Sequence, residues 1–213
     1  EPLPAGWQSL ITLSGKAKIL DYVRKQAPSN WVAQQQPGLW AKTSKYLQLS
    51  GYLNYKLTGE YKDSVGSQVG YIPFDYKEQQ WAKPSSWHWK ALPIHGEMLP
   101  QLKNAGEILG QVNEQAASET GLPLGLNVIA AGSDKACELL GAGGIEEDIG
   151  CLSYGTTATY NGNFDRYIES STMLPPYPAA MPGRYNTEAT AYPGYSMVSW
   201  LKQQTAQPEQ LQA

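Results

Sequence analysis

The sequence has few of the residues on which several classes of protein depend. Among its 213 residues are only two cysteines, Cys137 and Cys151, too few for a disulfide framework or a cysteine-based zinc site. It contains no run of about 18 or more apolar residues, so no segment is expected to span a membrane. Residues 1–4 lack the basic start and the apolar stretch of a signal peptide. These absences predict a soluble, cytoplasmic protein.

An excess of charge of either sign is also lacking. Sixteen Lys and Arg residues stand against nineteen Asp and Glu residues, which leaves a net charge of −3 and argues against nucleic acid as a partner. Phenylalanine is rare as well, with 2 residues against 14 Tyr and 7 Trp. Aromatic rings with a polar edge are expected where large side chains line a wet cleft or a polar interface.

The first two thirds of the chain are predicted to form helices separated by loops. The strongest helical pattern covers residues 43–57, where Thr43 or Ser44 can cap the start and Gly59 can end the helix in the left-handed conformation. Its apolar stripe consists of Tyr46, Leu49, Leu53 and Leu57. Shorter helices are predicted over residues 16–26, 113–120 and 195–204.

Residues 71–102 form an irregular segment that is rich in tryptophan and proline. It contains Trp81, Trp87, Trp89, His88 and His95. One interpretation stacks a sugar on an indole ring; the other, which we favour, uses the tryptophans to pin a long connection to the core. The two histidines have no cysteine or second carboxylate at ligand spacing, so no metal site is predicted here.

The pattern changes near residue 125 to a strand, a turn, a helix and two further strands. The apolar run 126–131 predicts a buried strand, and a short helix is expected over 135–140. Strands are then predicted over 149–154 and 158–160, interrupted by a turn at residues 155–157.

Asp134 stands between the first of these strands and the helix, and it has two interpretations. A short carboxylate at this position can cap the free amide groups of a helix start. A carboxylate at the carboxyl end of a strand also projects into the crevice where α/β proteins bind ligands, and there it could accept a proton. From the residues themselves, capping is the better supported interpretation.

The turn Gly155-Thr156-Thr157 also has two interpretations. It can be an ordinary turn between strands, or it can offer backbone and hydroxyl donors to a phosphate. The glycine cluster at 141–144 is not a Walker loop, because it lacks the Gly-Lys-Ser/Thr ending.

Taken together, these segments resemble the FGGY family of carbohydrate kinases. The matching segments, in the family's order, are Tyr52 to Glu60, Asp63-Ser64, Leu99-Pro100, Gly110 to Val112, Thr120 to Pro123, Ala131 to Cys137, Gly141 to Gly143, Ser153 to Thr157, Pro175 to Pro178 and Gly194 to Val198. Each match is modest, but they are spread over nearly the whole chain.

The resemblance implies an enzyme, a sugar or polyol kinase with the two-domain α/β fold of the ribonuclease H-like (actin-like ATPase) superfamily, only partly covered by this chain. It implies ATP and Mg²⁺ as cofactors and a small sugar or polyol as substrate. Asp134 matches the family's catalytic carboxylate, and Gly155, Thr156 and Thr157 match the turn that contacts the transferring phosphate. The resemblance therefore favours a catalytic role for Asp134 over capping.

Three further residues are candidates for substrate binding: Lys135, Asp63 and Thr12. Lys135 stands where many relatives carry a neutral residue; it could favour the ionised carboxylate, hold an acidic or hydroxyl-rich substrate, or simply be a solvated lysine. Asp63 is equally well explained as a turn residue after Gly59. Which sugar is the acceptor stays open.

The resemblance also implies that the chain is a piece of a larger protein. Residues 1–143 correspond to the C-terminal part of the first, substrate-binding domain, and residues 144–213 to the start of the second, ATP-binding domain. The family's Asp-x-Gly-Thr strand and adenosine pocket are not among these residues, so the chain by itself is expected to be inactive. A homodimer of the full-length protein stays open, and the alternative function is a non-catalytic sugar-binding or interaction module.

Overall fold

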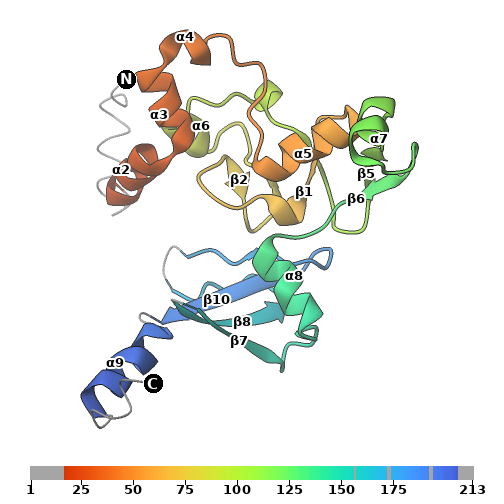
Figure 1. Ribbon diagram of the computed structural model, residues 1–213. Coiled ribbons are helices and arrows are strands. Elements are labelled where there is room, and N and C mark those ends of the chain that lie inside the picture. Colours follow the sequence, from red (N-terminus) through yellow and green to blue (C-terminus); the bar gives the residue numbers. More distant parts are fainter. Residues whose placement is uncertain (1–16, 156, 172–173, 192–193, 206–213) are drawn as a thin grey trace. The chain divides into compact units, whose positions relative to one another are not determined.

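The computed structural model describes residues 17–155, 157–171, 174–191 and 194–205, and the chain divides into two compact units (Figure 1). The first unit is Glu1–Ser133 and the second is Asp134–Ala213. The predicted domain boundary after residue 143 falls inside the second unit, and the assignment of the two kinase domains stays a prediction. None of the described helices is long and apolar enough to cross a membrane.

The described part of the first unit consists of short helices and strands. In chain order they are α2 (Ala17–Gln26), α3 (Pro28–Gln35), α4 (Pro37–Trp40), α5 (Leu49–Thr58), β1 (Lys62–Ser64), the 3₁₀ turn Val65–Ser67, β2 (Phe74–Asp75), β3 (Gln80–Trp81), α6 (His88–Ala91), the 3₁₀ turn Gly96–Met98, β4 (Gln101–Lys103), β5 (Ile108–Gln111), α7 (Glu114–Thr120) and β6 (Asn127–Ile129). The strands pair two by two: β1 with β4 in parallel, and β2 with β3 and β5 with β6 antiparallel.

Among the described residues, two apolar clusters form much of the core of the first unit. The larger one includes Leu20, Ala27, Leu92, Ile94 and Met98, and the smaller one consists of Val65, Ile72 and Phe74. Trp81 and Trp89 pack against these clusters, and their indole N–H groups donate to backbone carbonyls, with Trp81 bonded to Pro100 at 2.9 Å. These contacts support the packing interpretation of the tryptophan-rich segment.

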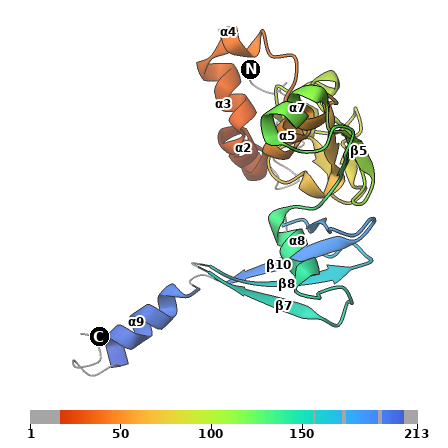
Figure 2. The ribbon, with the colours of Figure 1, turned by 45° about the vertical axis from the view of Figure 1, so that its right-hand side comes forward.

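The second unit is an antiparallel sheet with a helix packed on it. Its elements are α8 (Asp134–Gly141), β7 (Gly150–Tyr154), β8 (Ala158–Phe164), β9 (Tyr177–Pro178), β10 (Tyr185–Ala191) and α9 (Ser196–Thr205), with the strands in the order β7-β8-β10-β9. Both views show α8 lying across one face of this sheet (Figures 1 and 2). Ala136 and Leu139 are the buried residues of α8, so its apolar side faces the strands.

Several of the predicted elements are confirmed. Helices α2, α7, α8 and α9 lie where the sequence predicts them, and so do strands β7 and β8 on either side of the 155–157 turn. Gly59 and Gly121 end α5 and α7 in the left-handed conformation, with φ of 79° and 77°. Asn113 caps α7 by accepting a hydrogen bond from the Ala116 amide at 2.8 Å.

The predicted start and apolar stripe of the helix at residues 43–57 are wrong. Helix α5 begins at Leu49, because the backbone N–H of Tyr46 donates to the carbonyl of Met98 at 2.8 Å and keeps the preceding segment out of the helix. Leu49 and Leu53 are 74% and 51% exposed. The buried residue of α5 is instead Gly51, whose missing side chain allows the helix to approach a neighbouring strand.

The strand predicted over residues 126–131 is present as β6, but the prediction that it is buried is wrong. Asn127 and Ile129 are exposed and Val128 is half-buried. Strand β6 belongs to a two-stranded sheet, in which it pairs with β5, so its apolar side chains are not enclosed on both faces.

Candidate functional site

Asp134 is the first residue of α8, and its side chain is exposed. Its Oδ1 accepts a hydrogen bond from the backbone N–H of Lys135 at 2.7 Å, which satisfies one of the free amide groups at the helix start. The exposed carboxylate is also accessible to a substrate. The geometry is thus compatible with capping and with proton transfer, and the catalytic role stays a prediction.

Lys135 is more than a solvated lysine. Its ammonium group donates to Glu138 Oε2 at 2.7 Å and to Ser153 Oγ at 3.2 Å, so it connects α8 to strand β7. The hydrogen bond to Glu138 is the main reason why the pKa of Lys135 is raised above its ordinary value. A contact of Lys135 with substrate stays a prediction.

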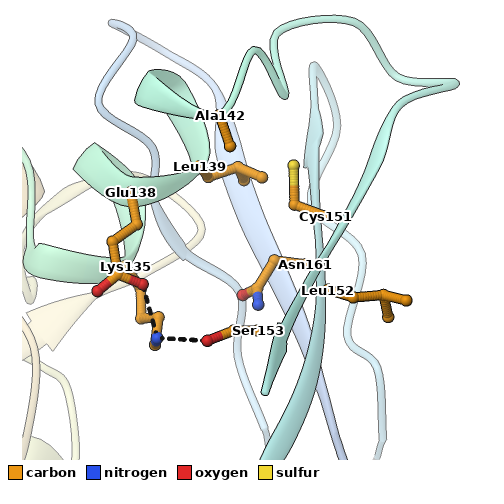
Figure 3. Close-up of a pocket in the computed structure, with 8 residues that line it drawn as sticks. All are labelled: Lys135, Glu138, Leu139, Ala142, Cys151, Leu152, Ser153 and Asn161. Atoms are coloured by element: carbon orange, nitrogen blue, oxygen red, sulfur yellow. Dashed lines mark hydrogen bonds and ion pairs between the residues drawn. The ribbon is translucent and has the colours of Figure 1, made fainter. Parts of the chain in front are cut away.

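A pocket of about 140 Å³ lies between α8 and strands β7 and β8 (Figure 3). Leu139 and Ala142 supply apolar surface on the helix side of the pocket, while Lys135, Ser153 and Asn161 supply polar groups. The Lys135–Ser153 contact runs along this pocket, as the close-up shows. Ser153 was not among the predicted site residues, because nothing in its sequence neighbourhood indicates a lysine partner 18 residues earlier.

The turn after β7 is hydrogen-bonded to the backbone of Tyr195, the residue that precedes α9. Tyr154 and Ala158 are paired across the antiparallel ladder, so residues 155–157 form the connection between β7 and β8. The Gly155 N–H donates to Thr157 O at 3.1 Å, and the Gly155 carbonyl accepts from the Tyr195 N–H at 2.8 Å. Thr156 lies outside the described residues.

This close approach of the two segments requires glycine at position 194. A Cβ at this position would lie 2.5 Å from Gly155 O, 2.6 Å from Thr157 C and 2.7 Å from Ala158 N. All three are backbone atoms that cannot move aside as a flexible side chain could. Gly194 belongs to a segment that resembles the FGGY family, but nothing in the sequence predicts a role for it, because its contact with the turn exists only in the folded chain.

Asp63 is fully buried in the first unit, at the centre of a polar cluster. Its carboxylate accepts hydrogen bonds from Ser50 Oγ at 2.9 Å, Gln68 Nε2 at 2.9 Å, Asn54 Nδ2 at 3.1 Å and the Ser64 N–H at 2.8 Å. Both oxygens are therefore engaged inside the protein. Substrate binding by Asp63 stays a prediction to which these contacts give no support, and Thr12, the remaining candidate, lies outside the described residues.

Stability should depend on pH through Asp63. Burial raises the pKa of this carboxyl above its ordinary value, while the hydrogen bonds from Gln68, Ser50, Ser64 and Asn54 oppose the rise. Its contribution to stability is complete below the unfolded-state pKa of about 3.9 and is lost as the pH rises through the folded-state pKa. The loss amounts to about 1.4 kcal/mol for each unit by which the pKa is raised.

The measurement is the free energy of unfolding of this 213-residue chain between pH 4 and 7, compared with Asp63→Asn. The advantage of the unsubstituted chain over the variant should shrink as the pH rises, because asparagine does not titrate. Gln26→Asn, at an exposed position on α2, is the control and should keep the difference constant, because neither residue titrates. An advantage that grows with pH would contradict the expected sign.

The architecture of the chain matches that of solved sugar kinases. It superimposes on a ligand-bound xylulose kinase from Lactobacillus acidophilus with a TM-score of 0.71 at 18% identity, over 92% of this chain and 42% of that one. This likeness shows the fold: an α/β chain that adopts part of the actin-like ATPase architecture, as predicted.

The sequence comparisons identify the family. Residues 27–141 match the N-terminal domain of the FGGY family of carbohydrate kinases, more than half of the chain, and the chain belongs to this family. An uncharacterised sugar kinase of Escherichia coli K12, YgcE, is 33% identical over 160 residues, which are 72% of this chain and 31% of that protein. A xylulose kinase of Lactococcus lactis is 26% identical over 174 residues, 81% of this chain and 34% of that protein. The chain thus spans about a third of the length of the curated relatives that it matches.

Proposed function

We propose that the whole protein is an ATP-dependent kinase that phosphorylates a hydroxyl group of a sugar or polyol. The observation that carries the proposal is the exposed carboxylate of Asp134 at the start of α8, in the unit that also contains the 155–157 turn. Membership of the FGGY family and the names of the relatives, sugar kinase and xylulose kinase, support the same reaction class.

Asp134 acts as the general base in this mechanism. Its carboxylate accepts the proton of the substrate hydroxyl while the hydroxyl oxygen attacks the γ-phosphorus of ATP and the bond to the β-phosphate oxygen breaks. An exposed carboxylate fits this task, because the substrate must reach it. Catalysis of phosphoryl transfer consists mostly of positioning and of charge stabilisation. The position of the base relative to the substrate hydroxyl therefore matters as much as its pKa.

The turn at residues 155–157 is proposed to contact the transferring phosphate. The backbone N–H of Tyr195 is hydrogen-bonded to Gly155 O, and Gly194 leaves space for this close approach, so the turn is restrained before an anion binds. The Thr157 hydroxyl is the proposed donor to the anion. A turn that carries hydroxyl groups and no carboxylate fits the phosphates of a nucleotide.

Mg²⁺ would neutralise charge on the phosphates when it is bound. Among the described residues no group of three or more His, Cys, Asp and Glu could hold a metal ion. An ion at this site would therefore be carried mainly by the nucleotide phosphates, which is a usual way in which proteins hold Mg²⁺.

The proposal is tested by ADP release from the whole protein with ATP, Mg²⁺ and a panel of pentuloses, hexuloses and polyols. At least one acceptor should support turnover of about 1–100 per second. Binding of a sugar in calorimetry without sugar-dependent ADP release from any member of the panel would instead favour the non-catalytic sugar-binding module.

A further inference from the structure

The chain immediately before Asp134 is attached to the 3₁₀ turn that follows β1. Ser64 Oγ donates to the carbonyl of Ala131, and it accepts the Gly66 N–H at 3.1 Å. The backbone N–H of Ser133 donates to the carbonyl of Gly66 at 2.8 Å. Two hydrogen bonds thus hold residues 131–133 at points two residues apart, and the second one involves the residue that precedes Asp134.

The turn that provides this attachment is itself rigidly held. Asp63, Ser64, Gly66 and Gln68 are all buried. The Gln68 amide donates both to Asp63 Oδ2 and to the carbonyl of Ser64, each at 2.9 Å, so it links the carboxylate to the backbone of the turn. Because water does not compete for these hydrogen bonds, they restrain the turn.

The approach of α5 completes the enclosure. A Cβ at Gly51 would lie 3.1 Å from Asp63 Oδ2, so the helix backbone reaches the carboxylate closely enough for Ser50 and Asn54 to donate to it. The buried carboxylate therefore holds the turn, and the turn holds residues 131–133, which directly precede Asp134.

We infer that Ser64, held in place by the Asp63 cluster, is a positioning residue for the catalytic base Asp134. The side chain of Asp134 is exposed, so its position depends on the backbone that carries it. An error of about 1 Å in the placement of a catalytic group can cost about 10²-fold in rate. This inference rests on the proposed function, because it assigns Ser64 to the positioning of the base in the same reaction.

The test is Ser64→Ala in the whole protein, measured with the best acceptor of the panel. Loss of the hydroxyl should lower kcat roughly 10-fold and leave the KM for the sugar within about twofold, since the base and not the sugar is displaced. Ser86→Ala is the matched control: it removes a serine hydroxyl in the same unit that is bonded to His88 Nδ1 and to no residue of the Asp63 cluster, and it should keep kcat within about twofold.

A double variant separates positioning from a general structural effect. If Ser64 acts through Asp134, Ser64→Ala should lower kcat little further once Asp134 is Asn, because the group that it positions is already absent. An equal loss in both backgrounds would overturn the inference and leave the kinase proposal intact. Unchanged turnover of Asp134→Asn by itself would instead overturn the assignment of the base.

Hydrogen exchange tests the attachment without any substitution. In the unsubstituted 213-residue chain, the Ser133 amide should exchange far more slowly than in an unstructured peptide, because it is bonded to Gly66 O. Exchange of this amide at the unprotected rate would overturn the inference even if Ser64→Ala failed to fold.

Discussion

Asp134→Asn is expected to lower kcat for sugar phosphorylation by roughly 10²- to 10⁴-fold, with binding of the sugar nearly unchanged. The amide has the shape of the carboxylate but cannot take the proton of the attacking hydroxyl. Asparagine also caps helix starts as well as aspartate does, so α8 should begin at the same residue. The substitution therefore removes the base and keeps the cap.

The measurement is sugar-dependent ADP release by the whole protein, with calorimetry of sugar binding alongside it. The matched control is Asp148→Asn, at an exposed position outside the described pocket and turn, which should leave kcat unaltered. Near-normal turnover of Asp134→Asn would show that the carboxylate serves the helix and that another group takes the proton.

Gly194→Ala should be the second most damaging of the proposed substitutions, with a fall in kcat of about 10²-fold. The added methyl group would meet the backbone of Gly155, Thr157 and Ala158 at 2.5–2.7 Å, far inside van der Waals contact. The start of α9 must then move away from the turn, which breaks the bond from the Tyr195 N–H to Gly155 O, or the turn itself must shift. In either case the proposed phosphate contacts lose their support.

The effect of Gly194→Ala should fall on phosphoryl transfer and spare the KM for the sugar, because the turn is proposed to contact phosphate. Steady-state kinetics with varied sugar at saturating ATP provides this comparison. Gly141→Ala is the control within the same unit, since a Cβ at this helical position would meet no atom within 4 Å. Full activity of Gly194→Ala would argue that the turn takes no part in the reaction.

The residues that end helices could be predicted because their effect is local. Gly59 and Gly121 adopt positive φ where each helix must stop, and the turn at 155–157 separates two strands, the second of which, β8, extends beyond its predicted end to Phe164. By contrast, the start of α5 could not be predicted. It depends on a hydrogen bond from Tyr46 to Met98, a residue far along the chain, which outweighs a favourable helical pattern.

In the candidate site, too, some residues could be predicted from the local sequence and others could not. Asp134 could be found because its position between a strand and a helix, and the segments around it, are visible in the sequence. For Asp63 the sequence could not distinguish a cleft residue from a turn residue. The structure places it in full burial with donors on α5 and on the turn after β1, an environment made by the approach of α5 at Gly51.

The sequence by itself therefore determined the family, the order of the main elements and the identity of the proposed base, since each is written in short segments whose order along the chain is directly readable. Only the tertiary structure decided what holds those segments in place. Ser64 and Ala131 are 67 residues apart, and Lys135 and Ser153 are 18 apart. Such pairs meet because burial of the apolar clusters and pairing of the strands bring distant backbone together, and no local pattern records which donor will then face which acceptor.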